Sequence, residues 1–207
     1  MTTFYCVRHG KTEFNRDGIF QGGLVDSPLL PEGIKGAHLA GKALKDIKFD
    51  LVIASPQKRA QDTAKAIIEE RQDNLIIKTI ENLREMKFGD WDGKYQTDYL
   101  DHPQFKMLVE SPQLYNPVEF NGESYDELIE RTTNVFHTIS KENPDKNILV
   151  VAHGLTLLAV LHTLTGGCTA DIRKNGFLDN TSITTLEFNS NDNLYSITNW
   201  NNTDHLK

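Results

Sequence analysis

Short apolar runs alternate along the chain with stretches in which apolar positions recur at helical spacing. The apolar runs and a run of β-branched residues predict strands at 4–7, 51–54, 75–80, 148–152, 182–188 and 194–198. The helical spacing predicts helices at 32–47, 56–70, 125–139 and 155–165. Strands that alternate with helices are typical of an α/β fold with a mainly parallel sheet covered on both faces.

Two helix starts carry recognisable capping signals. Ser55 followed by Pro56 predicts an N-cap with proline at the first helical position. Ser124 and Glu127 have the spacing of a capping box. Between these helices the stretch 89–123 contains scattered prolines and many aromatic residues, which predicts an irregular or short-helical insertion.

The chain contains no repeats and no linker rich in glycine and serine. We therefore expect residues 1–207 to form a single domain, with the insertion at about 94–122. The longest apolar runs are five residues, too short for a membrane-spanning helix. The first residues contain neither a basic leader nor a long apolar stretch, so no secretory signal is visible. Cys6 and Cys168 are too few for a disulfide framework, and we expect reduced thiols in a cytoplasmic protein.

The charge of the chain restricts its partners. With 22 Lys+Arg against 29 Asp+Glu, the formal net charge is −7. Nucleic-acid binding needs a basic surface, so this balance disfavours it. Small anionic substrates are also repelled unless cations are concentrated locally.

Such a concentration follows directly after the predicted strands. Arg8 and His9 come after the first strand, Arg59 lies in the first turn after the second, and His153 follows the run at 148–152. In open α/β sheets ligands bind beyond the carboxyl ends of the strands, so these side chains should meet at one edge. Guanidinium groups and helix N-termini favour phosphate oxygens. The convergence therefore predicts a phosphate site.

Each of these signals is weak by itself, and their combination carries the prediction. Arg8-His9-Gly10 alone could be an ordinary loop, Arg59 a surface residue of a helix, and His153 a buried structural histidine. The remaining histidines do not follow a predicted strand, and we expect structural roles for them: His38, His102, His137, His162 and His205.

The same residues resemble the RHGxTxxN signature of the histidine phosphatase superfamily, which includes the cofactor-dependent phosphoglycerate mutases. The signature stands here at residues 8–15. The resemblance continues in family order at 21–22, 26–29, 55–64, 83–85, 88–93, 122–124, 153–154 and 180–182. It thus spans nearly the whole chain, and it implies a three-layer α/β/α sandwich.

The resemblance also implies roles for individual residues. His9 corresponds to the nucleophile that is transiently phosphorylated, and Glu85 to the proton donor. The implied phosphate ligands are Arg8, Arg59, His153 and the adjoining Gly154, helped by Asn15, Gln21 and Gly22. Asn180 and Ser182 match a weaker motif and are expected only to support the site. No metal is required, because the arginines and His153 supply the positive charge.

The chemistry of phosphate-ester cleavage fits these roles. His9 attacks phosphorus only when neutral, and two neighbouring arginines disfavour its protonation. His153 is expected to act as an imidazolium that donates to the phosphoryl oxygens. Glu85 must be protonated to assist the leaving group, and as a carboxylate it then activates water. We therefore expect a pH optimum on the acid side of neutral.

A mutase needs a second binding site for an anionic group, because it must retain the phosphorylated intermediate until the phosphoryl group returns. A hydrolase does not need this site. The glycolytic mutases carry an arginine-rich stretch after the region matching 91–93, whereas 94–122 contains no arginine here. We therefore favour a metal-independent phosphomonoesterase for small phosphorylated metabolites, with no cofactor. The alternative is a phosphoglycerate mutase that uses 2,3-bisphosphoglycerate.

Two further classes stay open at this stage. A zinc or manganese hydrolase would use His9, His153 and Glu85 as ligands, but flanking arginines would repel the metal. A non-catalytic phosphate-binding module would usually have lost the nucleophile or an arginine. The expected partner is a small phosphate monoester, not a nucleic acid or a membrane. The protein is expected to be a monomer or a homodimer.

Overall fold

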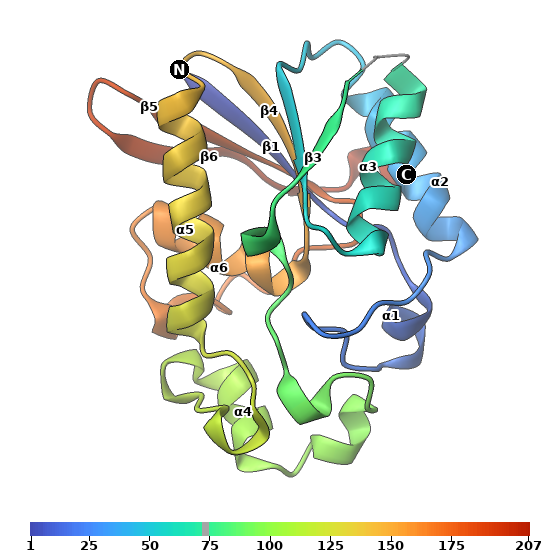
Figure 1. Ribbon diagram of the computed structural model, residues 1–207, viewed down its shortest axis with the longest axis vertical. Coiled ribbons are helices and arrows are strands. Elements are labelled where there is room, and N and C mark those ends of the chain that lie inside the picture. The colour runs from blue at the N-terminus through green and yellow to red at the C-terminus, as the bar shows by residue number, and fades with distance from the viewer. Residues whose placement is uncertain (72–74) are drawn as a thin grey trace.

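The computed structural model describes residues 1–71 and 75–207 as a six-stranded sheet with helices on both faces (Figure 1). The strands are β1 (Thr2–Arg8), β2 (Leu51–Ala54), β3 (Ile77–Thr79), β4 (Asn147–Ala152), β5 (Ile183–Asn189) and β6 (Leu194–Asn202). The helices are α1 (Glu13–Asp17), α2 (Pro31–Ala43), α3 (Lys58–Arg71), α4 (Pro103–Glu110), α5 (Tyr125–Glu142) and α6 (Gly154–Leu164).

The sheet is mainly parallel, as the sequence predicts. Its strand order is β3-β2-β4-β1-β5-β6. The pairs β3–β2, β2–β4 and β4–β1 are parallel, whereas β5 pairs antiparallel with both β1 and β6. The edge strand β3 has three residues, half the predicted run, and among the described residues it pairs only with β2. The carboxyl ends of β1, β2 and β4 therefore lie side by side.

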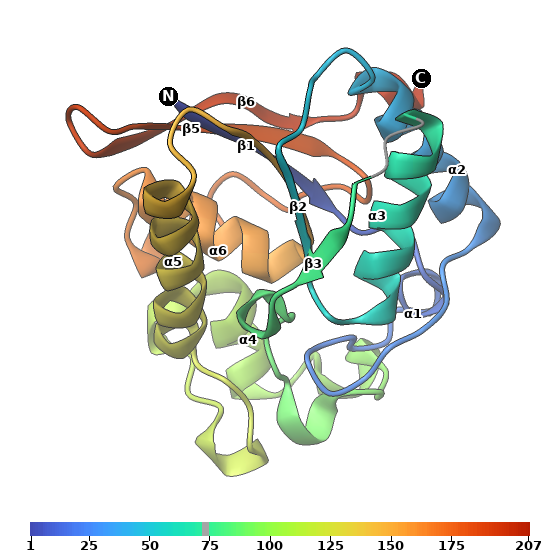
Figure 2. The same cartoon turned by 45° about the horizontal axis from the view of Figure 1, so that its top comes forward.

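Both faces of the central strands are buried, which explains their continuous apolar sequences. On β1, Phe4 and Cys6 pack in the core cluster that contains residues of α5 and α6. Val7 packs on the opposite face, in the cluster that contains residues of α2 and α3. Figure 2 shows the resulting three layers, with α2 and α3 on one side of the sheet and α5 and α6 on the other. The predicted α/β/α sandwich is confirmed.

Helix α2 is shorter than predicted and buries only small residues. Ile34 is 43% exposed although its spacing places it with the apolar positions, while Ala37 and Ala40 are fully buried. A Cβ on Gly41 would lie 2.5 Å from the Ile67 carbonyl oxygen of α3. The two helices therefore pack too closely for larger side chains between them.

The helix after β2 begins later than the sequence indicates. Ser55 does not cap it, because α3 starts at Lys58 and the Ser55 hydroxyl lies 2.7 Å from His153 Nε2. The carboxylate of Asp26 instead accepts a hydrogen bond from the Lys58 backbone N–H. The capping box predicted at Ser124 and Glu127 is confirmed at the start of α5.

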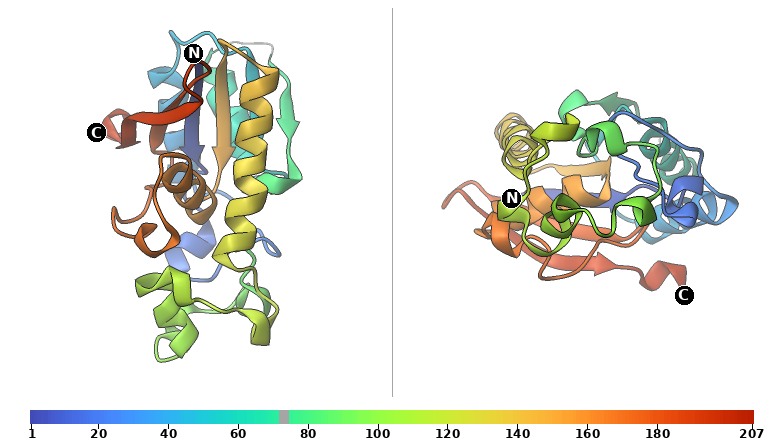
Figure 3. Two further views of the ribbon diagram at one scale, coloured as in Figure 1. Left: turned by 90° about the vertical axis from the view of Figure 1, so that its left-hand side faces the viewer. Right: turned by 90° about the horizontal axis from the view of Figure 1, so that it is seen from below.

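The insertion consists of short helices, as predicted, and lies beyond the carboxyl ends of the parallel strands (Figures 1 and 3). Besides α4, the stretch 89–123 contains short 3₁₀ helices at Gly89–Trp91, Gln96–Tyr99, Pro112–Leu114 and Val118–Phe120. Its aromatic residues build a third core cluster together with residues of α5 and α6. The insertion thus covers the sheet edge at which the predicted phosphate site lies. No helix within 1–71 or 75–207 has the length and apolar character needed to cross a membrane.

Candidate active site

The imidazole of His9 stands at the end of β1 with one ring nitrogen committed to the backbone. Its Nδ1 lies 2.8 Å from the carbonyl oxygen of Gly10. Since a carbonyl oxygen only accepts, Nδ1 carries the proton and Nε2 keeps a lone pair. The ring is therefore oriented with a nucleophilic nitrogen available.

The surroundings of His9 keep it uncharged. The side chain is 3% exposed. Burial first, and then the positive charges of Arg59 and Arg8, hold its pKa well below the ordinary value. His9 is consequently neutral at pH 7, which is the form that can attack phosphorus.

The loop after His9 is fixed by close packing. A Cβ on Gly10 would lie 2.5 Å from the carbonyl oxygen of Gly33 at the start of α2, so only glycine fits there. The Gly10 N–H donates to the hydroxyl of Thr63 on α3. Asn180 donates from Nδ2 to the His9 carbonyl oxygen at 2.9 Å. These contacts position the imidazole from three separate segments.

A cavity of about 160 Å³ opens in front of His9. Its polar end is lined by Arg8, His9, Glu85 and Gly154. Most of the remaining wall is apolar, and part of it comes from the insertion, through Phe105 and Leu108. The site thus combines a cationic end with an apolar chamber, as expected for a pocket that takes a phosphate ester of a small molecule.

Arg8 lines the cavity and packs against Gly154 at the start of helix α6. A Cβ on Gly154 would lie only 3.3 Å from Arg8 Nε, so the glycine leaves room for the guanidinium. Arg8 Nη1 donates to the Leu178 carbonyl oxygen, whereas Nε is buried and has no hydrogen-bond partner. Arg8 therefore keeps a donor that a phosphoryl oxygen can use.

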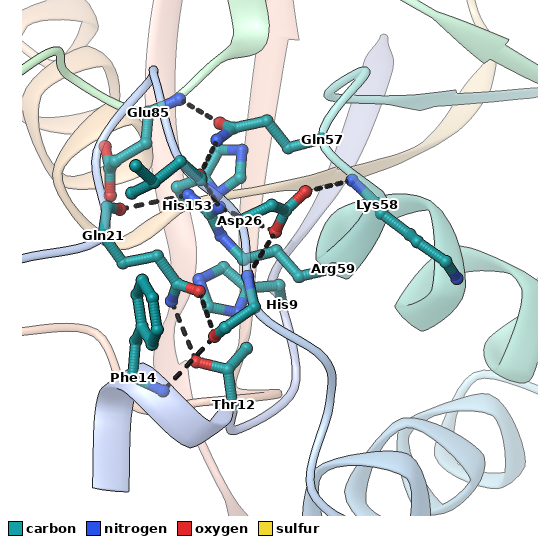
Figure 4. Close-up of polar contacts among 12 residues, drawn as sticks. His9, Thr12, Phe14, Gln21, Asp26, Gln57, Lys58, Arg59, Glu85 and His153 are labelled. Atoms are coloured by element: carbon teal, nitrogen blue, oxygen red, sulfur yellow. Dashed lines mark hydrogen bonds and ion pairs between the residues drawn. The ribbon is translucent and has the colours of Figure 1, made fainter. Parts of the chain in front are cut away.

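Arg59 is close to His9 but is largely occupied. Its Nη1 donates to Asp26 Oδ1 at 2.9 Å, and its Nη2 donates to the Gln21 carbonyl oxygen (Figure 4). Only Nε is buried without a partner, and the side chain does not line the cavity. Arg59 thus holds the loop at 21–26 and contributes positive charge beside His9.

His153 likewise lies beside His9 and outside the cavity wall. The two imidazole centroids are 5.2 Å apart. His153 Nδ1 is buried without a hydrogen-bond partner. Burial first, then Arg59, His9 and Arg8, hold the His153 pKa well below its ordinary value. Two arginines and complete burial therefore favour the neutral ring while no phosphate is bound, and the imidazolium donor stays a prediction for the phosphate complex.

Glu85 is held at the N-terminus of α6 by several donors. Its carboxylate accepts hydrogen bonds from the backbone N–H groups of Met86, Leu155 and Thr156, and from the Thr156 hydroxyl. The Glu85 N–H donates to Gln57 Oε1 at 2.9 Å (Figure 4). The carboxylate is therefore fixed at the edge of the cavity, on the same wall as His9 and Arg8.

Of the predicted helpers on the loop at 21–22, Gln21 lines the cavity, but its side-chain amide is bonded to other protein groups. Gln21 Nε2 donates to the Thr12 hydroxyl at 2.9 Å (Figure 4). Gln21 Oε1 accepts from the Ser27 hydroxyl. The Gly22 N–H donates to Asp92 Oδ1, and Gly22 does not line the cavity. Asn15 lines the cavity, and its Oδ1 accepts from the Thr12 N–H. The side chain of Gln21 and the N–H of Gly22 therefore hold the loop at 21–26 in place and are not free to donate to a phosphate.

Three further polar residues support the site, and none of them is among the predicted site residues. Thr156 orients Glu85, Ser55 bonds His153, and Gln57 ties Glu85 to the loop at 22–25. Thr156 follows His153 at a helix N-terminus, a position from which an acidic partner could have been anticipated. Arg173 also lines the cavity, and nothing in its local sequence indicates this.

The two buried histidines predict acid-sensitive stability. Both have pKa values below those of the unfolded chain, so the unfolded state binds more protons below about pH 6.5. Between pH 6.5 and 5.5 the free energy of unfolding should fall by about 1 kcal/mol for each histidine. Urea titrations of the wild type and His9→Asn at pH 7.5, 6.5 and 5.5 test this. Between pH 6.5 and 5.5 the free energy of unfolding of His9→Asn should fall by about 1 kcal/mol less than that of the wild type. An equal fall in both proteins would contradict the buried, cationic environment of His9.

Within residues 1–71 and 75–207, no group of three or more histidine, cysteine, aspartate or glutamate side chains is arranged to hold a metal ion. His9, His153 and Glu85, the ligands that a metal hydrolase would need, therefore do not form such a group. The cationic neighbours Arg8 and Arg59 suit an anion instead.

Known proteins with similar sequences and structures exist. The sequence pattern of the histidine phosphatase superfamily (branch 1) matches residues 4–203. The adenosylcobalamin/α-ribazole phosphatase of Escherichia coli is 31% identical over 78% of this chain and 78% of its own. The metal-independent phosphoserine phosphatase of Arabidopsis thaliana is 29% identical over 100% of this chain and 84% of its own.

Two further comparisons bear on the fold and on the reaction. The structure of Bacillus stearothermophilus YhfR superimposes with a TM-score of 0.92 at 26% identity and covers 100% of both chains. A 2,3-bisphosphoglycerate-dependent phosphoglycerate mutase of Cytophaga hutchinsonii is 31% identical over 78% of this chain and 76% of its own. Phosphatases and a mutase thus both occur among the similar proteins.

Proposed function

The chain belongs to the histidine phosphatase superfamily, and we propose that it hydrolyses phosphate monoesters of small metabolites through a phosphohistidine on His9. The observation that carries this proposal is the state of His9. Its Nδ1 is bonded to the Gly10 carbonyl oxygen, and its pKa is lowered by burial and two arginines. The free Nε2 is therefore a nucleophile at neutral pH.

The first half of the reaction forms the phosphoenzyme. Nε2 of His9 attacks phosphorus, the bond from phosphorus to the ester oxygen breaks, and protonated Glu85 gives its proton to the leaving oxygen. Arg8 and Arg59 supply donors and positive charge to the phosphoryl oxygens. A phosphate dianion beside His153 would favour its imidazolium form, which restores the donor role expected for this residue.

The second half returns the enzyme to its starting state. Glu85, now a carboxylate, takes a proton from water, and the hydroxide attacks phosphorus as the bond to His9 Nε2 breaks. Inorganic phosphate leaves, and Glu85 again holds a proton. The four donors around Glu85 keep its oxygens in place through both steps.

The composition of the insertion favours hydrolysis over isomerisation. Residues 94–122 contain no arginine, so the insertion offers no cluster of guanidinium groups to retain a bisphosphorylated intermediate. The metal-independent phosphoserine phosphatase among the relatives supports a reaction that needs no metal or other cofactor. We further expect the protein to act in the cytoplasm on a small phosphate monoester.

The test is phosphorus NMR of the enzyme with a panel of small phosphomonoesters in EDTA. Inorganic phosphate should appear at the same rate with and without the chelator. With 3-phosphoglycerate and catalytic 2,3-bisphosphoglycerate, inorganic phosphate should grow without 2-phosphoglycerate. Growth of 2-phosphoglycerate would establish a mutase, and loss of activity in EDTA would indicate a metal enzyme.

A further inference from the structure

Arg173 lies in the segment between α6 and β5 and lines the same cavity as His9. It is part of none of the motifs that indicate the phosphate site. Its Nε donates to the Tyr125 hydroxyl at 3.0 Å, and its guanidinium carbon lies 4.6 Å above the ring centroid of Phe177. These two contacts hold the plane of the guanidinium in a fixed orientation.

The guanidinium nevertheless keeps an unused donor. Arg173 Nη1 is buried and has no hydrogen-bond partner. Arg16, Arg59, Arg84 and Arg131 are each paired with a carboxylate. Arg8 and Arg173 have no ion pair within residues 1–71 and 75–207, although the whole chain carries a formal charge of −7. Both of these arginines line the cavity in front of His9. A ligand with two anionic groups would suit them.

We propose that Arg173 binds a carboxylate on the leaving group, so that the preferred substrates are small phosphate monoesters that carry a carboxylate. This inference rests on the proposed phosphatase function. Arg8 lines the end of the cavity that receives the phosphoryl group, and Arg59 and His153 lie beside His9 just outside its wall. Arg173 is then the cation available to the other end of the substrate, and a planar guanidinium suits a carboxylate.

The rest of the cavity wall favours a carboxylate over an ammonium group. Glu85 is the one acidic side chain among the described residues that line the cavity, and it is expected to serve the ester oxygen. The wall between the charged residues is largely apolar: Phe20, Phe88, Phe105, Leu108 and Leu155. A second phosphate dianion in this wall would need more positive charge than one guanidinium supplies. The cavity of about 160 Å³ also suits a short carbon chain.

Two phosphate esters separate this inference from a general phosphatase. O-phosphoserine carries both an ammonium and a carboxylate group, whereas O-phosphoethanolamine lacks only the carboxylate. The wild type should hydrolyse phosphoserine with a kcat/KM about 10- to 100-fold higher, since a hydrogen bond to a charged group is lost with the other ester. Arg173→Gln should remove this preference by lowering the value for phosphoserine alone.

Control variants address the structural contacts of Arg173. Lys174→Gln removes the neighbouring positive charge, which is outside the cavity wall, and should leave the preference intact. Tyr125→Phe removes the hydroxyl that fixes Arg173 Nε but keeps the guanidinium. Arg173→Lys keeps the positive charge but removes the planar pair of guanidinium donors. Both should retain part of the preference. If Arg173→Gln lowers kcat/KM for both esters by the same factor, Arg173 is merely structural and the proposal is overturned.

Binding measurements keep the inference testable apart from catalysis. In the His9→Ala background, calorimetric titration should show phosphoserine binding about 10- to 100-fold more tightly than phosphoethanolamine, and addition of Arg173→Gln should equalise the two. Equal binding in the presence of Arg173 would overturn the inference even if the enzyme hydrolyses both esters. Preferential binding without any hydrolysis by the wild type would support the carboxylate site and refute the proposed phosphatase function.

Discussion

Replacement of His9 by alanine should abolish the hydrolysis of phosphate esters, with a loss of at least about 10⁴-fold in kcat. The variant lacks the Nε2 lone pair that attacks phosphorus, and Glu85, at the same end of the cavity, is held by four donors as the proton donor. Steady-state rates with several esters measure the effect. Covalent phosphate should also disappear when the protein is exposed to a labelled phosphate donor.

The fold should survive this substitution. The side chain loses its bond to the Gly10 carbonyl oxygen, while the backbone N–H of residue 9 still donates to the Ala152 carbonyl oxygen. Circular dichroism and thermal unfolding at pH 7.5 verify this. His38, half-buried on α2 beside Glu70 of α3, does not line the cavity, so His38→Ala is the matched control and should retain full activity. Retained covalent phosphate in His9→Ala would refute the nucleophile assignment.

Replacement of Glu85 by glutamine should lower kcat by about 10²- to 10⁴-fold for alkyl phosphate esters, because the leaving oxygen then lacks a proton donor. With p-nitrophenyl phosphate, the rate of the phosphorylation step should fall less than with alkyl esters, because the p-nitrophenolate leaving group needs no proton. The hydrolysis of the phosphohistidine should be slow with either ester, since no carboxylate activates water. Glu119→Gln, an exposed carboxylate of the insertion, is the control and should behave as the wild type.

The pH profile tests the same residue. In the wild type, turnover should be greatest on the acid side of neutral, because Glu85 must carry a proton when the ester oxygen leaves. The low pKa of His9 allows this, since the nucleophile stays neutral below its ordinary titration range. A flat or strongly alkaline profile would contradict the assignment of Glu85 as the proton donor.

The sheet and the phosphate end of the site follow from local sequence patterns. Runs such as 148–152 are apolar because both faces of β4 are buried, and the polar residue after such a run must lie at the sheet edge. Arg8, His9 and His153 are predicted by this rule from the strands alone. That the chain forms a single domain stays a prediction. It is tested by thermal unfolding, which should show a single transition.

Other features depend on contacts that a one-dimensional pattern does not contain. Ser55 before Pro56 has the pattern of an N-cap, yet its hydroxyl bonds His153, which is 98 residues away in the chain. The charge of His153 depends on complete burial beside Arg59, which its neighbours in the sequence do not indicate. Arg173 reaches the cavity only because its segment packs against Tyr125 at the start of α5.

The most direct test of the phosphohistidine is a rapid-quench experiment with Glu85→Gln and p-nitrophenyl phosphate. Phosphorylation of His9 should be fast and hydrolysis slow, so p-nitrophenolate should appear in a burst of about one equivalent per active site. Mass spectrometry after an alkaline quench should then find the phosphoryl group on His9. Turnover without a burst, or phosphate on a different residue, would contradict the mechanism proposed for this site.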